Sequence, residues 1–285
     1  MPPPRSSADD SHAVVSGQAE LLADADRPGG WLLLVDRVRQ SYVDLNDPTY
    51  LDLEYVQHFA CAVDALPEGP LAVTHIGGGA MCFPRYIAAT RPGSPQIVFE
   101  PDEKLTTLVR QRLPLPKTAR VRVRPQFGRQ GMAQLRDASA DIVVLDAFLG
   151  ARVPMDLTTA EFFAEAARTL RPEGLLIANI ADGAPMLYLR RVLAAAALQF
   201  SELLIVVDPA VLKGRRYGNV VFCASRAALP AQTLKRYAAG AMFPLRVMDG
   251  EEIKRFVAGA LPFRDDDAER SPAPPDELWR MEEDW

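Results

Sequence analysis

A run of three glycines and a later glutamate give the clearest chemical signal in the sequence. Gly77–Gly79 follow an apolar run at 71–76, and Glu100 ends a second apolar run that begins at Gln96. Glycine lets the backbone turn sharply and approach a ligand that a β-carbon would exclude, and an acid at the end of the next strand can accept both ribose hydroxyls. The pattern predicts a site for a nucleoside-bearing cofactor, whereas the structural alternative is a tight turn and a solvated glutamate. A nicotinamide dinucleotide is disfavoured, because its G-x-G-x-x-G motif would need glycine in place of Cys82.

A second candidate group ends the apolar run at 142–145. Asp146 follows these four residues and precedes a loop that contains Gly150, so we expect its side chain at the same edge of the sheet as the glycine turn. A carboxylate there can accept a proton from an attacking group or hold a cation. The structural alternative is an aspartate that caps a helix or braces the loop, which is a common use of this residue type.

The elements that must position these groups alternate along the chain. Near-continuous apolar strands are typical of a parallel sheet that is covered on both faces. Strands are expected at 71–76, 96–100, 120–124, 141–146, 174–180, 202–207 and 219–224, and helices at 82–90, 102–112, 157–170 and 184–199. The last two strands should be antiparallel, because too few residues separate them for a crossover helix. The predicted fold class is α/β, with a doubly wound, mostly parallel seven-stranded sheet that binds ligands beyond the carboxyl ends of its strands.

Composition divides the rest of the chain into further regions. Residues 1–28 are rich in Pro, Ser, Ala and Asp without a sustained period, so a disordered leader is expected. Residues 29–50 contain two short β-like runs, which predict a short N-terminal β-hairpin. Residues 51–262 should form the nucleoside-binding catalytic domain, entered through an amphipathic helix at 51–66. Residues 263–285 are acidic and proline-rich and are expected to be a tail.

Bulk composition argues against several classes of protein. The chain has 285 residues and a formal net charge of -5, which disfavours a nucleic-acid surface and suits a cationic small substrate better. The sequence opens without a signal-peptide pattern, and no apolar run reaches the roughly 18 residues that a membrane span requires. We therefore expect a cytoplasmic protein without a membrane partner. The three cysteines have neither disulfide nor zinc spacing, so no metal is expected.

Several motifs occur together between Gln40 and Ser225. They are Gln40-Ser41-Tyr42, Tyr55, His75-Ile-Gly-Gly-Gly79, Glu100-Pro-Asp102, Asp146 with Pro154, and Leu157-Thr-Thr-Ala-Glu-Phe-Phe163. In these motifs the chain resembles the spermidine synthases, or polyamine aminopropyltransferases, and especially the spermidine synthase-like proteins of actinobacteria. That resemblance implies the Rossmann-like fold of the class I S-adenosylmethionine-dependent methyltransferases.

The resemblance also implies an activity and roles for individual residues. It implies transfer of an aminopropyl group from decarboxylated S-adenosylmethionine to a small amine acceptor, as in polyamine biosynthesis, and it allows a homodimer. Asp146 would be the catalytic base and would bind the amine together with Tyr55. The residues implied for the cofactor are Gln40, Gly77, Gly78, Gly79, Glu100, Phe127 and Gly128.

Two family acids are missing from this sequence. The family usually carries D-x-x-D after the fourth strand, where the second acid binds the diamine, and Leu149 stands in its place. The family also carries an aspartate for the adenine amino group after the third strand, where this chain has Phe127, a ring that can stack on adenine but cannot accept its hydrogen bond. Because an unpaired buried cation is costly, two alternatives stay open: a methyltransferase that uses intact S-adenosylmethionine, and a catalytically silent nucleoside-binding homologue.

Overall fold

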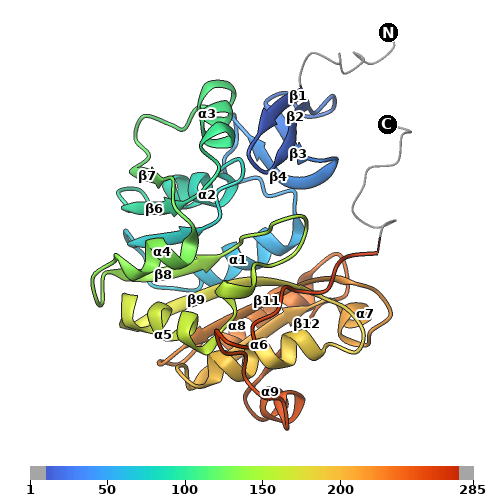
Figure 1. The fold of residues 1–285 in the computed structure, drawn as a ribbon. Coiled ribbons are helices and arrows are strands. Elements are labelled where there is room, and N and C mark those ends of the chain that lie inside the picture. Colours follow the sequence, from blue (N-terminus) through green and yellow to red (C-terminus); the bar gives the residue numbers. More distant parts are fainter. Residues whose placement is uncertain (1–10, 276–285) are drawn as a thin grey trace.

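The computed structural model describes residues 11–275 and, within them, two β-sheets (Figure 1). The smaller, antiparallel sheet consists of β1 (Ser11–Val14), β2 (Gly17–Ala23), β3 (Gly30–Val35) and β4 (Val38–Asp44). The larger sheet consists of β5 (Val73–Ile76), β6 (Gln96–Phe99), β7 (Val121–Arg124), β8 (Ala140–Leu145), β9 (Leu170–Asp182), β10 (Glu202–Val207), β11 (Gly218–Ser225) and β12 (Arg246–Asp249). The helices are α1 (Glu54–Asp64), α2 (Cys82–Thr90), α3 (Glu103–Arg112), α4 (Gly128–Ala133), the short 3-10 helix η2 (Met155–Leu157), α5 (Ala160–Thr169), α6 (Leu187–Ala197), α7 (Pro209–Leu212), α8 (Ala231–Gly240) and α9 (Gly250–Val257).

The larger sheet confirms the predicted α/β fold. Its strand order is β12-β10-β11-β9-β8-β5-β6-β7, and the strands from β9 to β7 in this order run parallel. The pair β10 and β11 is antiparallel, as the short connection between them predicts. The seven expected strands are all present, but the expected strand number was wrong because β12 adds an eighth. That edge strand has four residues and pairs only with β10, so it is too short to show a period in the sequence.

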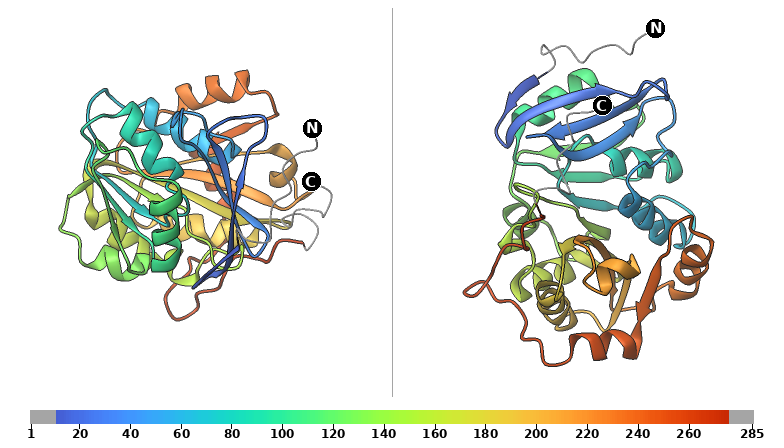
Figure 2. Two further views of the ribbon diagram at one scale, coloured as in Figure 1. Left: turned by 90° about the horizontal axis from the view of Figure 1, so that it is seen from above. Right: turned by 90° about the vertical axis from the view of Figure 1, so that its right-hand side faces the viewer.

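Helices cover both faces of the larger sheet, as the two further views show (Figure 2). In β8, Val143 and Leu145 belong to a core cluster shared with α5 and α6. Ile142 and Val144 belong to a second cluster, shared with α1 and α2. All four side chains are at most 2% exposed. Because successive residues of a strand point to opposite faces, burial on both faces requires the uninterrupted apolar run seen in the sequence.

The first residues that the structure describes depart from expectation. The predicted leader is wrong for residues 11–28, because β1 and β2 complete a four-stranded sheet in which the predicted hairpin supplies β3 and β4. Ala19 and Leu21 are 0% and 2% exposed and pack in one cluster with side chains of α3. The alternation of buried and exposed residues in β2 is hard to recognise in the sequence, because the strand contains small and acidic residues. The composition of this region therefore favoured disorder. Residues 1–10 lie outside the described residues.

The expected tail is also wrong for residues 263–275. Phe263 is 1% exposed and packs against the ring of Tyr188, with the Arg191 guanidinium 3.9 Å from its centroid. Ser271 is fully buried, and its hydroxyl accepts a hydrogen bond from the backbone N–H of Val153 at 2.9 Å. Phe263 and Ser271 are isolated buried residues in an irregular segment, so the sequence there has no helical or strand periodicity from which their burial could be predicted. The expected tail at 276–285 lies outside the described residues.

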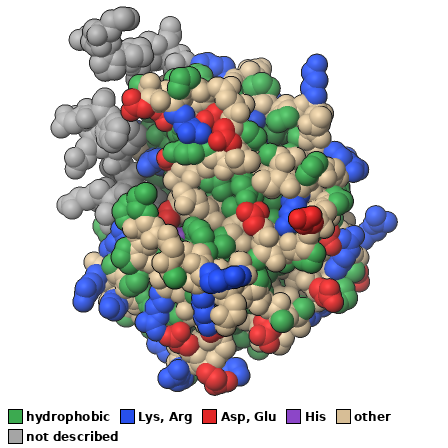
Figure 3. All heavy atoms as spheres, turned by 180° about the vertical axis from the view of Figure 1, so that it is seen from behind, with side chains coloured by type: hydrophobic (Ala, Val, Ile, Leu, Met, Phe, Trp, Pro, Cys, Tyr) green, Lys and Arg blue, Asp and Glu red, His purple; other side chains and the backbone are tan. Residues whose placement is uncertain are grey.

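The surface seen from behind carries both signs of charge. Figure 3 shows acidic and basic side chains interspersed with apolar ones over that face. Among residues 11–275, none of the helices combines the length and the apolar character needed to cross a membrane.

Burial of β2 generates a direct test of the N-terminal sheet. Leu21→Ala should lower the free energy of unfolding by about 2–5 kcal/mol, because truncating a buried leucine leaves a cavity. Leu22, the half-buried neighbour on the opposite face, provides the matched control, and Leu22→Ala should cost less than half as much. Urea unfolding followed by circular dichroism measures both. Equal, near-zero effects of the two substitutions would mean that the segment does not pack as described.

Candidate active site

One cavity of about 570 Å³ lies at the carboxyl edge of the parallel strands, between the two sheets. A volume of this size suits a small-molecule ligand. The segments that follow β5, β6, β7 and β8 line it from the larger sheet, and β4 and the β1–β2 turn line it from the smaller one. The structure brings every sequence-predicted site residue to this cavity: Gln40, Tyr55, Gly77, Gly78, Gly79, Glu100, Phe127, Gly128 and Asp146.

The strand order fixes how these groups follow one another. Asp146 comes after β8, the glycine turn after β5, Glu100 after β6 and Phe127 after β7, and these four strands are consecutive neighbours in the sheet. The cavity therefore has two ends. Asp146 stands at one end, Phe127 stands at the other, and the glycine turn and Glu100 lie between them.

Gly77 fills a position that no other residue can take. Its φ angle is +94°, and a β-carbon there would lie 2.0 Å from the carbonyl oxygen of Asp146. The Asp146 backbone N–H in turn donates to the carbonyl of Ile76 at 2.9 Å. The glycine turn and the Asp146 loop are thus packed backbone against backbone.

Glu100 is held by backbone N–H groups on both carboxylate oxygens. One oxygen accepts from Gly78 at 3.0 Å and from Gly79 at 3.4 Å, and the other accepts from Asp102 at 3.0 Å. Burial raises the pKa of Glu100, and the three backbone hydrogen bonds counter part of that rise. The carboxylate is fixed in orientation and keeps lone pairs for a ligand's hydroxyl groups.

Asp146 is half-buried and receives two side-chain hydrogen bonds. The Tyr55 hydroxyl donates to one oxygen at 3.2 Å, and the Asn179 amide donates to the other at 3.1 Å. Burial raises the pKa of Asp146 to about 6, although both hydrogen bonds oppose the rise. Neither bond comes from a backbone N–H, so the alternative of a helix cap does not describe this residue. A carboxylate with such a pKa is ionised at neutral pH and accepts protons more readily than an ordinary aspartate.

Gln40 reaches the cavity through an irregularity in the smaller sheet. Leu33 pairs with Ser41 and Leu34 with Arg39, which leaves Gln40 as the extra residue of a β-bulge. Bulges turn a side chain out of the regular alternation and are common beside active sites. The Gln40 side chain lines the cavity and has no hydrogen-bond partner among residues 11–275.

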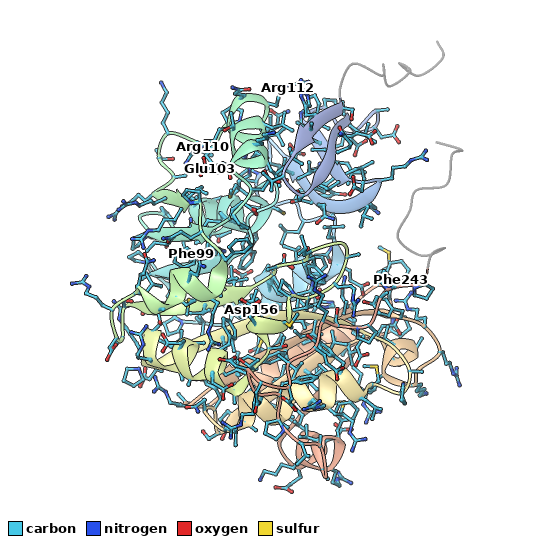
Figure 4. All side chains as sticks on the ribbon, in the orientation of Figure 1. Phe99, Glu103, Arg110, Arg112, Asp156 and Phe243 are labelled. Atoms are coloured by element: carbon cyan, nitrogen blue, oxygen red, sulfur yellow. The ribbon has the colours of Figure 1, made fainter. Side chains whose placement is uncertain are left out.

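The opposite end of the cavity combines an exposed ring with a free carboxylate. Phe127 is 60% exposed, and a β-carbon on the next residue, Gly128, would come within 3.3 Å of the Leu157 side chain. This contact brings η2, which contains Asp156, next to the start of α4, and both Phe127 and Asp156 line the cavity. Asp156, labelled near the centre of the view in Figure 4, is exposed, and it lines the cavity without a hydrogen bond or ion pair to any described residue.

Sequence reasoning missed Asn179 and Asp156. Asn179 is 1% exposed within a strand whose neighbours are apolar, and a polar residue inside such a run was a detectable signal. Asp156 had no comparable signal, because only the folded path of its loop brings it to the cavity.

The charged side chains of the cavity wall are mostly acidic. Five carboxylates belong to it, against a single cation within residues 11–275: Asp36, Glu100, Asp102, Asp146 and Asp156, and Arg270. Such an excess of negative charge in a concave site attracts cationic ligands.

Comparisons with known proteins show what this chain is similar to in sequence and in fold. No family model matches the chain. A curated polyamine aminopropyltransferase of Chromobacterium violaceum is 25% identical over 140 residues, 49% of this chain and 53% of that protein, so the match spans about half the length of the curated relative. The crystal structure of a probable spermidine synthase from Corynebacterium glutamicum is 31% identical with a TM-score of 0.84, covering 90% of this chain and 95% of that one. A spermidine synthase in complex with the transition state analogue AdoDATO shares the fold, at 16% identity and a TM-score of 0.56 over 87% and 82% of the two chains.

The raised pKa of Asp146 predicts a pH-dependent stability difference. Its folded-state pKa of about 6 exceeds the ordinary 3.8, so the stabilising contribution of its proton is complete below about pH 4 and is lost as the pH rises through 6. Asp146→Asn cannot ionise, so this variant should be more stable than the wild type at pH 7, and the gap should close toward pH 4. Urea unfolding of both proteins across this range measures the gap.

The control is Asp26→Asn, which changes an exposed aspartate outside the cavity. Its stability difference from the wild type is measured over the same pH range and subtracted from that of Asp146→Asn. A corrected gap for Asp146→Asn that stays flat from pH 4 to pH 7 would contradict the raised pKa.

Proposed function

Since the chain belongs to the spermidine synthase family of polyamine aminopropyltransferases, we propose that it transfers the aminopropyl group of decarboxylated S-adenosylmethionine to a small primary amine. The observation that carries the proposal is that one acidic cavity contains both a glycine turn with a glutamate held by backbone N–H groups and a carboxylate whose pKa is about 6. The glycine turn and the glutamate suit a nucleoside. The carboxylate suits removal of a proton from an amine.

The nucleoside would lie between Glu100 and Phe127. Glu100 would accept the ribose hydroxyls, because its carboxylate is already oriented by Gly78, Gly79 and Asp102. Adenine would stack on the exposed face of Phe127 above Gly128. Gln40, whose amide is free of partners among the described residues, would lie over the cofactor.

The chemistry would take place at Asp146. Decarboxylated S-adenosylmethionine supplies a sulfonium that activates the adjacent propyl carbon, so that an amine nitrogen bonds to this carbon as the carbon–sulfur bond breaks and sulfur keeps the electron pair. An alkyl amine has a pKa of about 10 and enters mostly protonated. Asp146 would bind the ammonium group and take its proton, while Tyr55, whose pKa burial raises further above its ordinary value, stays a hydrogen-bond donor to Asp146. Holding the two substrates in line would supply much of the rate.

The assay for this proposal follows the nucleoside product. Purified protein incubated with decarboxylated S-adenosylmethionine and a panel of amines should release methylthioadenosine only when amine is present. Asp146→Asn should lower the rate by at least about 10²-fold, since it removes the proton acceptor. The wild-type rate should fall as the pH drops through about 6, where Asp146 becomes protonated. Chromatography of the nucleosides measures each outcome.

Two results would replace the proposal by its alternatives. Formation of S-adenosylhomocysteine from intact S-adenosylmethionine would establish a methyltransferase. Retained binding of methylthioadenosine without turnover of any amine would establish a silent nucleoside-binding homologue. Unchanged activity in Asp146→Asn would remove this residue from the mechanism.

For the adenine amino group we propose Asp156 as the hydrogen-bond acceptor. It is a partner-free carboxylate of the wall among the described residues, and the contact of Leu157 with Gly128 brings η2, which contains it, next to the start of α4. It would thereby replace the family aspartate that is absent after the third strand.

A ligand pair tests this assignment. Asp156→Ala should weaken methylthioadenosine binding by about tenfold, as expected for loss of a hydrogen bond to a charged group. It should leave methylthioinosine, which has a carbonyl in place of the amino group, nearly unaffected. Isothermal calorimetry measures both dissociation constants, and Asp266→Ala, at an exposed acid outside the cavity, is the control. Equal weakening of both ligands would contradict the assignment.

A further inference from the structure

A smaller pocket of about 40 Å³ continues the active-site cavity on the side of β9 and β11. It shares Gln40, Tyr55 and Phe148 with the main cavity. Since a buried water needs about 10–15 Å³, the pocket has room for about three or four water-sized groups. In the sheet, β9 and β11 lie on the side of β8 away from β5 and β6, so the pocket extends from Asp146 away from the nucleoside.

One of the residues that line this pocket carries an unpartnered acceptor atom. Asn179 is 1% exposed, and its amide nitrogen donates to Asp146. Its amide oxygen is buried and has no hydrogen-bond partner within the described residues. A buried amide oxygen without a donor costs about 1–3 kcal/mol, and a ligand that donates to it would remove that cost.

A second asparagine stands on the same face of the sheet. In the register of β9 with β11, Ala181 lies opposite Asn219 and Asn179 lies opposite Val221. Residues two apart on one strand share a face of the sheet, as do their cross-strand partners. Asn179 and Asn219 are therefore diagonal neighbours on the same face of adjacent strands. Asn219 lines the pocket, and its side chain has no partner among residues 11–275.

Within residues 11–275, no carboxylate lines the smaller pocket, in contrast to the main cavity. Its one charged side chain among the described residues is Arg39, which is paired with Asp52 at 2.7 Å. Leu149, at the mouth of the main cavity, is apolar and 46% exposed. A second ammonium group in this pocket would meet a guanidinium and neutral amides, while the neighbouring carboxylates are already engaged, Asp52 by Arg39 and Asp146 by Tyr55 and Asn179.

We infer that this pocket receives the far end of the acceptor, and that the acceptor is a primary amine whose far end is an uncharged hydrogen-bond donor, such as a hydroxyl, and not a second ammonium. This inference rests on the proposed function for the identity of the reacting end. The reacting amine would lie at Asp146, and the far end would donate to the orphaned oxygen of Asn179.

Two isosteric amines test the inference. 4-Amino-1-butanol and 1,4-diaminobutane differ only in the group at one end. Calorimetric titration of each into protein saturated with methylthioadenosine should show that the amino alcohol binds at least about tenfold more tightly, since only the diamine buries an unpaired charge. Equal or tighter binding of the diamine would overturn the inference, and so would failure of both amines to bind.

A charge-introducing variant sharpens the test. Asn219→Asp adds a carboxylate to the pocket without touching Asp146, and it should shift the binding ratio by about tenfold toward the diamine. Gln111→Glu adds the same charge on the exposed surface of α3 and should leave the ratio unchanged. A ratio that does not move in Asn219→Asp would overturn the inference.

Product formation separates this inference from the proposed function. If neither amine yields methylthioadenosine but the amino alcohol binds preferentially, the proposed function fails and the binding preference stands. If methylthioadenosine forms with a preference for the diamine, the proposed function stands and the inference fails.

Discussion

The close approach of Gly77 to the backbone of Asp146 is the constraint on which the site depends. A β-carbon at Gly77 would overlap the Asp146 carbonyl, and the Asp146 N–H is bonded to the residue before the glycine. The ends of two neighbouring strands are thereby locked together. Because Glu100 accepts hydrogen bonds from Gly78 and Gly79 of the same turn, the proposed ribose-binding group and the proposed proton acceptor are both connected to it.

Much of the fold could be predicted, because strands that are buried on both faces of a parallel sheet have uninterrupted apolar runs in the sequence. Ile142 to Leu145 are apolar without interruption, and the glycine turn and Glu100 carry their spacing in the sequence itself. The rest depended on contacts between distant residues. Leu21 needs the surface of α3 to become a core residue, and Asp156 reaches the cavity only because Leu157 packs near Gly128. Asn179 is an intermediate case, since a polar residue in an apolar strand was visible but its partner was not.

The smaller sheet is connected to the centre of the cavity at two points. In the β1–β2 turn, Ser16 donates both its N–H and its hydroxyl to Asp102, at 2.8 and 2.7 Å. Asp102 donates its own N–H to Glu100. A chain of three hydrogen-bonded residues thus connects a segment with little hydrophobic pattern to the acid at the centre of the cavity. The bulge at Gln40 provides the second connection from the same sheet.

Ser16 and Arg270 come from opposite ends of the described chain and line the same cavity. Contacts between residues so far apart in sequence form late in folding, because closing a long loop costs entropy before the contact can compensate it. The parallel core around β5 and β8 is made of much shorter connections. A chain in which only that core had formed would lack the finished cavity, because Ser16 and Arg270 would not yet line it. Ligand binding is therefore a stricter criterion of the native state of this protein than its helix and strand content.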